Sequence, residues 1–170
     1  KKLSKKSSVI ITTGGGSVGD ADYIRDALLK IGSINFWKIS IKPGRPLAFG
    51  TIGSSYFFGL PGNPVSTSVT FDLFVRPAIY KILSLKKRKD ITIKATLVGA
   101  LRKKRGRVEY KRGILFKKEG KYYVKASGLQ GSNILSSLAI ANCYIKLGMD
   151  IENIKESEIV TTIPFEVSHE

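Results

Sequence analysis

The sequence predicts an α/β domain followed by a small all-β domain, and two observations lead to this division. In the first half, short apolar runs alternate with glycine- or proline-rich turns and with helical patterns, which is the order that builds α/β proteins. After a basic run at 86–89, short apolar runs are separated by charged or glycine-containing turns, with no long helical pattern. We therefore expect an α/β domain over 1–86 and a barrel or sandwich over 90–170.

The composition limits the classes of protein to consider. The chain has 170 residues, of which 42% are hydrophobic, so it is long enough for one domain or two small ones. No apolar run is long enough to span a bilayer, so we expect no membrane partner and a cytoplasmic location. The single cysteine, Cys143, excludes an internal disulfide and lies in an apolar run, where a buried thiol is expected. With one cysteine and one histidine, His169, a zinc site of the usual kind is excluded.

The formal net charge of +16 is unevenly distributed, with most of the excess between residues 81 and 125. A field of this kind attracts nucleic acid, an anionic membrane or an anionic small molecule. A solvated, lysine-rich surface explains the same charge without any ligand. Composition alone leaves these interpretations open.

A glycine-rich segment follows the first predicted strand, 9–13, and precedes a predicted helix, 20–31. Glycine lets the backbone approach a ligand closely, and the free N–H groups of such a turn, with the helix dipole, suit an anion such as phosphate. A plain tight turn is the alternative. The candidate binding residues are Gly14, Gly15, Gly16, Ser17, Gly19 and Asp20.

The second candidate segment is the strand predicted over 34–42, which alternates apolar and polar residues. This alternation places Lys38 and Lys42 on the same face of one strand. A stiff turn at 43–46 follows. Two short strands, 47–50 and 56–60, are then expected to form a hairpin.

The sequence Pro-Gly-Asn-Pro at 61–64 is the third candidate segment. Asn63 is a good N-cap and Pro64 suits the first position of a helix, which we expect over 65–83 with a kink or division at Pro77. The first half then forms a largely parallel sheet, in which ligands gather at the carboxyl ends of strands. Because all three candidate turns follow strands, we expect them to line one crevice.

The second half consists mainly of predicted strands. A short helix or irregular turn fits 132–140. The strands are expected over 91–101, 108–118, 122–126, 142–147 and 158–162.

Residues 13–23, 36–46 and 59–66 together, in this order and spacing, resemble the C-terminal half of molybdopterin molybdenumtransferases, the molybdenum-insertion enzymes of molybdenum cofactor biosynthesis. Residues 110–113 and 130–132 match more weakly. The resemblance implies a partial three-layer α/β/α molybdopterin-binding domain followed by a small β-barrel domain. It also implies that the complete protein inserts molybdate into adenylylated molybdopterin with Mg²⁺ as the divalent metal, and that it forms a homodimer.

The resemblance assigns roles to individual residues. It implies that Asp22 is the acidic residue of the active cleft and a Mg²⁺ ligand. Lys38 and Lys42 are implied as the catalytic basic pair that contacts phosphate or molybdate. Arg112 and Ser132 are implied to reach the same cleft from the barrel. The implied substrate-binding residues are Gly14, Gly15, Gly16, Ser17, Gly19, Asp20, Pro61, Gly62, Asn63, Pro64, Arg112 and Ser132.

The match begins in the middle of the family's molybdopterin-binding domain. We therefore expect the isolated chain to be an incomplete enzyme, with a sheet edge suited to pairing with another chain. Within the same fold, a molybdopterin adenylyltransferase is the nearest alternative, but the second domain and the 42–46 motif favour metal insertion.

Two other classes of function remain. One is a nucleic-acid-binding module that uses the basic segment 102–107 as a phosphate clamp. Few aromatic residues accompany that segment, which argues against single-strand recognition. We do not expect a nucleic-acid partner. The other is a non-catalytic oligomeric scaffold of the same fold.

Overall fold

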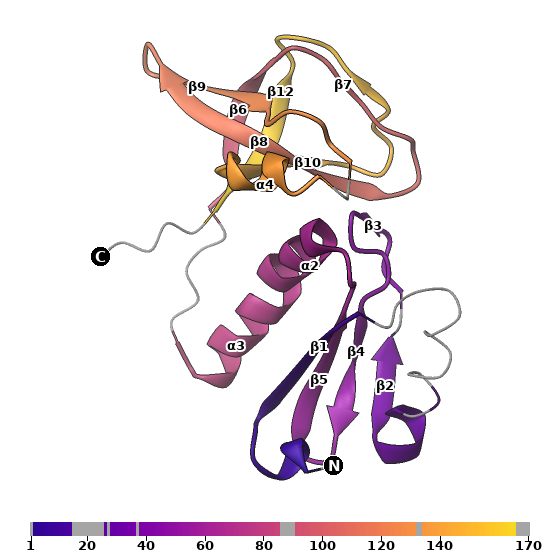
Figure 1. Ribbon diagram of the computed structural model, residues 1–170. Helices are drawn as coiled ribbons and strands as arrows, with labels where there is room; N and C mark the ends of the chain where they lie inside the picture. Colours follow the sequence, from indigo (N-terminus) through magenta and orange to yellow (C-terminus); the bar gives the residue numbers. More distant parts are fainter. Residues whose placement is uncertain are drawn as a thin grey trace. The chain divides into compact units, whose positions relative to one another are not determined.

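The computed structural model describes residues 2–14, 26, 28–36, 38–85, 91–131 and 134–165 (Figure 1). The chain divides into two compact units, Lys1–Ile39 with Pro43–Lys87, and Ser40–Lys42 with Arg88–Glu170. The sequence places Ser40–Lys42 in the first domain, but these residues belong to the second unit because they carry a strand of its sheet. The boundary expected between 86 and 90 lies outside the described residues.

The first unit contains a four-stranded sheet with the order β1-β5-β4-β2 (Figure 1). β1 (Val9–Thr13) and β5 (Ser55–Leu60) are parallel, whereas β4 (Ala48–Ile52) and β2 (Ser33–Phe36) run antiparallel to their neighbours. The predicted hairpin is confirmed. The prediction of a largely parallel sheet is wrong, because the two-residue connection between β4 and β5 permits only an antiparallel pair.

The prediction of a single strand over 34–42 is also wrong. β2 ends at Phe36, residues 38–40 are not in a strand, and β3 (Ile41–Lys42) pairs with a strand of the second unit. The chain therefore leaves the first sheet before Lys38. Lys38 and Lys42 do not share one strand face.

The long helix of the first unit is divided as the sequence predicts. It consists of α2 (Pro64–Thr70), the π-helical turn η2 (Phe71–Val75) and α3 (Arg76–Ile82). Pro77 lies in the first turn of α3. Proline has no N–H for the helical ladder, and its ring crowds the carbonyl four residues earlier, which accounts for the widened turn before it.

Both faces of the four-stranded sheet are covered. Phe57 packs with Leu28, from the short helical stretch 28–31, on one face. Phe58 packs with Val75, and with partly buried residues of η2 and α3, on the other face. Consecutive residues of a strand point to opposite faces, so β5 contributes to both cores. The described residues thus form the partial three-layer α/β/α arrangement. Of the helix expected over 20–31, only positions 26 and 28–31 are described, and they are helical.

The second unit is a closed β-barrel, in which β10 pairs with β12, β12 with β6, β6 with β9, β9 with β8, and β8 again with β10. β3 adds to the outside of this ring by pairing with β8. A separate two-stranded ribbon joins β7 to β11. The bounds are β6 (Ile93–Val98), β7 (Leu101–Arg102), β8 (Val108–Lys118), β9 (Lys121–Ala126), β10 (Cys143–Leu147), β11 (Asn153–Ile154) and β12 (Ile159–Pro164).

The barrel interior is filled by apolar side chains from its strands, among them Leu97, Val124 and Ile145. A short helix, α4 (Ser136–Ala139), lies where the sequence predicts one. A 3₁₀ turn, η1 (Leu3–Lys5), precedes β1. Across the described ranges, no helix combines the length and the apolar character needed to cross a membrane.

Candidate functional site

Two of the predicted turns meet at the same end of the first sheet. β1 and β5 are parallel with Thr13 opposite Leu60, so the residues that follow them emerge side by side (Figure 1). The amide of Gly14 donates a hydrogen bond to the carbonyl of Leu60 at 3.2 Å. A Cβ atom on Gly62 would lie only 3.2 Å from the Cα of Gly14. The glycine-rich segment and the Pro-Gly-Asn-Pro turn therefore contact one another where each begins.

Gly14 also requires glycine for its backbone. Its φ is +90°, in the left-handed region that favours glycine, and a Cβ there would meet no atom of the described residues within 4 Å.

Asn63 caps helix α2, as the sequence predicts. Its Oδ1 accepts hydrogen bonds from the amides of Val65 and Ser66 at 3.1 and 3.3 Å, and its carbonyl accepts from the amide of Thr67 at 2.8 Å. The hydroxyl of Thr67 donates to the carbonyl of Pro61 at 2.5 Å. The first amides of α2 are thus used within the turn, so Asn63 and Pro64 shape it rather than leave helix amides for an anion.

Several predicted site residues lie outside the described residues, and the structure does not place them. Their roles stay predictions. They are Gly15, Gly16, Ser17, Gly19, Asp20, Asp22 and Ser132.

Lys38 and Lys42 differ in their surroundings. Lys38 is exposed in the connection after β2. Lys42, in β3, places its Nζ 3.3 Å from Oε1 of Glu109, a carboxylate that is 4% exposed. The Nζ of Lys111 lies 3.0 Å from the same oxygen. The sequence analysis missed Glu109 and Lys111; the available signal was an acid and a base two residues apart on one strand face.

Arg112 is buried, with 1% of its surface exposed. Its guanidinium donates to the hydroxyl of Ser137 and to the carbonyls of Leu129, Gln130 and Gly131, at distances of 2.9 to 3.3 Å. Burial lowers the pKa of Arg112, while the nearby carboxylate of Glu109 opposes that shift. These bonds make Arg112 the anchor of the loop that leads to residue 132, and its contact with a ligand stays a prediction.

Gln130 extends the same anchor. Its side-chain carboxamide accepts from the amide of Arg112 at 2.8 Å and donates to the carbonyl of Arg112 at 3.1 Å. This pair of bonds imitates the pairing of a neighbouring β-strand. Arg112 of β8 therefore holds the loop 128–131 through both its side chain and its backbone.

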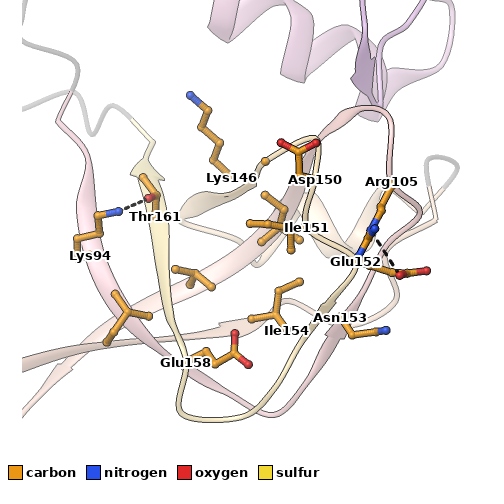
Figure 2. A pocket seen from close by; sticks show the side chains of 14 residues that line it. Lys94, Arg105, Lys146, Asp150, Ile151, Glu152, Asn153, Ile154, Glu158 and Thr161 are labelled. Carbon is orange, nitrogen blue, oxygen red and sulfur yellow. Dashed lines mark hydrogen bonds and ion pairs between the residues drawn. The ribbon is translucent and has the colours of Figure 1, made fainter.

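A separate open hollow of about 710 Å³ lies in the barrel unit (Figure 2). Its lining combines three cations, Lys94, Arg105 and Lys146, with three acids. Lys94 donates to the hydroxyl of Thr161 at 2.8 Å, and Arg105 lies 3.6 Å from Glu152. With balanced charge, this hollow offers an anionic substrate little net attraction.

The basic segment 102–107 is partly structural. The Nζ of Lys103, a residue that is 6% exposed, donates to the carbonyls of Met149 and Ile151 at 3.3 and 2.7 Å. Arg105 is paired with Glu152. Two of the cations needed for a phosphate clamp are therefore engaged within the chain, and the comparisons below give the nucleic-acid alternative no support.

Cys143 is a buried thiol, as predicted. Burial raises its pKa to about 12, against a smaller opposing effect of a hydrogen bond with the backbone of Leu115. A thiol that remains protonated is a poor nucleophile.

The described residues contain no cluster of metal-binding side chains. Among them, no group of three or more His, Cys, Asp or Glu side chains gathers to hold a metal ion. Asp22, the implied ligand, lies outside this part of the chain.

The two units correspond to two known families. Residues 1–81 match the family described as "Probable molybdopterin binding domain". Residues 94–165 match the "MoeA C-terminal region (domain IV)".

Individual relatives agree with these matches. A molybdopterin molybdenumtransferase of Haemophilus influenzae is 41% identical over 162 residues, which cover 94% of this chain and 40% of the relative. Gephyrin of Dictyostelium discoideum is 34% identical, over 94% of this chain and 26% of its own length. A crystal structure of a molybdopterin biosynthesis MoeA protein from Pyrococcus horikoshii has a TM-score of 0.78 at 26% identity, covering 98% of this chain and 39% of that chain.

The fold and the two family matches agree on the class: the first unit is similar to a probable molybdopterin-binding domain, and the second to the MoeA C-terminal region. Within that class, the chain is related over nearly its whole length to the C-terminal part of molybdopterin molybdenumtransferases, which confirms the resemblance stated above. The chain spans less than half the length of the relatives described here.

Proposed function

We propose that the chain is the C-terminal part of a molybdopterin molybdenumtransferase, an enzyme that inserts molybdate into adenylylated molybdopterin during molybdenum cofactor biosynthesis. The observation that carries the proposal is the contact between the turns of Gly14 and Gly62 at the carboxyl ends of the parallel strands β1 and β5. Ligands of α/β sheets bind at this edge. Relatives that bear the transferase name support the choice of substrate.

The chemistry of the substrates fits the residues at hand. Adenylylated molybdopterin carries phosphates and molybdate is an oxyanion, so both require fixed positive charge and close approach of backbone amides. In this proposal the turn at Gly14 provides the close approach. That Lys38 and Lys42 provide the charge stays a prediction. Asp22 as a ligand of Mg²⁺ stays a prediction.

We also propose that the chain forms a homodimer. Within the described ranges, β1 pairs only with β5, and the other edge of β1 presents unpaired backbone groups, the arrangement that favours addition of a strand from another chain. Sedimentation velocity over a range of concentrations tests this proposal. A dimer that grows with concentration supports it, and a monomer throughout contradicts it.

Titration calorimetry with adenylylated molybdopterin, in the presence and absence of molybdate, tests the proposed function. We expect the chain to bind, and we expect a Lys38→Ala/Lys42→Ala variant to bind about tenfold or more weakly, a difference of about 1.4 kcal/mol. A Lys118→Ala/Lys121→Ala variant is the control, because it removes the same charge from exposed positions at one hairpin tip.

Equal binding by the chain and the Lys38→Ala/Lys42→Ala variant would remove the assigned roles of the two lysines. A tight dimer with no affinity for the pterin would instead support a non-catalytic scaffold.

A further inference from the structure

The carboxylate of Glu109 is shared by two lysines in the second unit. Its Oε1 lies 3.0 Å from Nζ of Lys111 and 3.3 Å from Nζ of Lys42. The side chains of Glu109 and Lys111 are 5% and 9% exposed, whereas that of Lys42 is 50% exposed. Lys42 therefore faces solvent, whereas Glu109 and Lys111 are buried.

The strand register explains why these groups meet. β3 is parallel to β8, with Lys42 opposite Glu109. Glu109 and Lys111 are two residues apart on β8, so their side chains share a face. Their partners on β10 are Leu147 and Ile145, which are members of the barrel core. The pair thus occupies the rim of an apolar interior, where an unpaired charge is costly.

The charges of the group are not balanced. A buried pair of Glu109 and Lys111 alone is neutral, and it satisfies the carboxylate without any help from β3. Lys42 adds a second ammonium to the same oxygen, so the group carries one net positive charge at its exposed end. A structural ion pair needs only one cation, and the additional exposed cation points to a role toward solvent.

Anchoring changes what an exposed lysine offers to a ligand. A free lysine side chain has several rotatable bonds and loses entropy when an anion fixes it. A contact with Glu109 orders the ammonium of Lys42 before any ligand arrives and uses one of its three donors. Among the described residues, no further hydrogen bond or ion pair of that ammonium is present, so its other donors face outward. Without Lys111, the same carboxylate would cancel the charge that an oxyanion seeks.

We propose that Glu109 is a positioning residue that holds the ammonium of Lys42 ready for an oxyanion, and that Lys111 keeps the group cationic. The inference rests on the proposed function, in which Lys42 contacts a phosphate of adenylylated molybdopterin or the molybdate ion. It assigns Glu109 and Lys111 a role in preparing Lys42, which belongs to the same unit, for the anion.

The test uses the full chain and four variants: Lys42→Ala, Lys111→Met, Glu109→Gln/Lys111→Met, and the triple variant that adds Lys42→Ala. Glu109→Gln alone leaves the charge of Lys111 buried without a counter-charge, so the double variant, which removes both buried charges together, is the informative one. Calorimetry measures the dissociation constant for adenylylated molybdopterin at two salt concentrations, and urea unfolding of each variant is followed separately.

We expect Glu109→Gln/Lys111→Met to weaken binding about tenfold. In the Lys42→Ala background, the same double change should have almost no further effect, because it acts through Lys42. Lys111→Met alone should weaken binding more at low salt than at high salt, since it removes the net charge of the group. If Glu109 and Lys111 had only a structural role, the double change would alter the free energy of unfolding but leave the dissociation constant of the folded variant unchanged.

Three results would overturn the inference. If Lys42→Ala weakens binding while Glu109→Gln/Lys111→Met binds like the unaltered chain, Glu109 does not position Lys42 and the proposed function stands. If the double change weakens binding equally with and without Lys42, its effect does not pass through that lysine. If the unaltered chain binds no adenylylated molybdopterin, the proposed function falls and this inference falls with it.

Discussion

The turn at Gly62 packs against the backbone of Gly14, so closely that a Cβ on Gly62 would lie 3.2 Å from the Cα of Gly14. This contact joins two segments that are far apart in the sequence and that the parallel pairing of β1 and β5 brings to one edge. The two glycines belong to the described part of the proposed substrate site.

Gly62→Ala should weaken binding of adenylylated molybdopterin severalfold. The new methyl group forces the two turns apart by a few tenths of an ångström, which displaces the backbone that approaches the ligand. Calorimetric titration measures the effect. Gly148→Ala is the matched control, because its added Cβ would make an ordinary contact at 3.7 Å with Ile151 in the barrel unit. Equal affinities of Gly62→Ala and Gly148→Ala would show that this turn does not form the site.

Asn63→Ala should lower the free energy of unfolding by about 1 kcal/mol, the usual effect of removing an N-cap. The reason is that the amides of Val65 and Ser66 lose their acceptor. Urea unfolding checks the value. Asn63→Ser, which keeps a capping oxygen, should recover most of the loss, and a failure to recover it would assign the effect to another contact of the turn.

Arg112→Lys should lower the free energy of unfolding by about 2–4 kcal/mol. An ammonium cannot reproduce the fork of bonds to Ser137 and to three loop carbonyls, and it would remain buried. The conservative change Arg107→Lys, at an exposed position, serves as the comparison and should leave stability unchanged. Similar unfolding curves for the two variants would contradict the anchoring role of Arg112.

Stability should fall as the pH rises above about 8.5, the ordinary pKa of a cysteine thiol, and Cys143 should account for part of the fall. The pKa of Cys143 is raised to about 12 in the folded chain, so the folded state keeps a proton that the unfolded state releases. The stabilisation is complete below the unfolded pKa and is lost, by about 1.4 kcal/mol per pH unit, between the two values.

Urea unfolding between pH 7 and pH 10.5 compares the chain with Cys143→Ala. The unaltered chain should lose stability more steeply above pH 9. If the free energies of unfolding of the two proteins change with pH in parallel, the thiol has the same pKa in the folded and unfolded states, which would contradict this prediction.

Local features of the fold could be predicted from the sequence. The cap formed by Asn63 and Pro64, the hairpin at Gly53 and the division of the helix at Pro77 each depend on residues within a few positions of one another. Barrel strands were recognisable from the same kind of pattern.

Pairings between distant segments could not be predicted in this way. Nothing near Lys42 indicates that β3 pairs with β8, and the ion pair with Glu109 depends on that register. The burial of Lys103 could not be predicted either. Its neighbours in the sequence indicate a basic surface segment, but its ammonium donates to the carbonyls of Met149 and Ile151. The roles of the lysine side chains depend on these contacts between distant segments. The turn at Gly14 and the helix cap at Asn63 depend on neighbouring residues and could be predicted.

The most direct test of the central claim is the change in backbone amide chemical shifts when adenylylated molybdopterin is added to the isotope-labelled chain. The account predicts the largest changes at Gly14, Gly62 and Lys42. Changes confined to the hollow of the barrel, around Lys94, Arg105 and Lys146, would place the ligand elsewhere and contradict it.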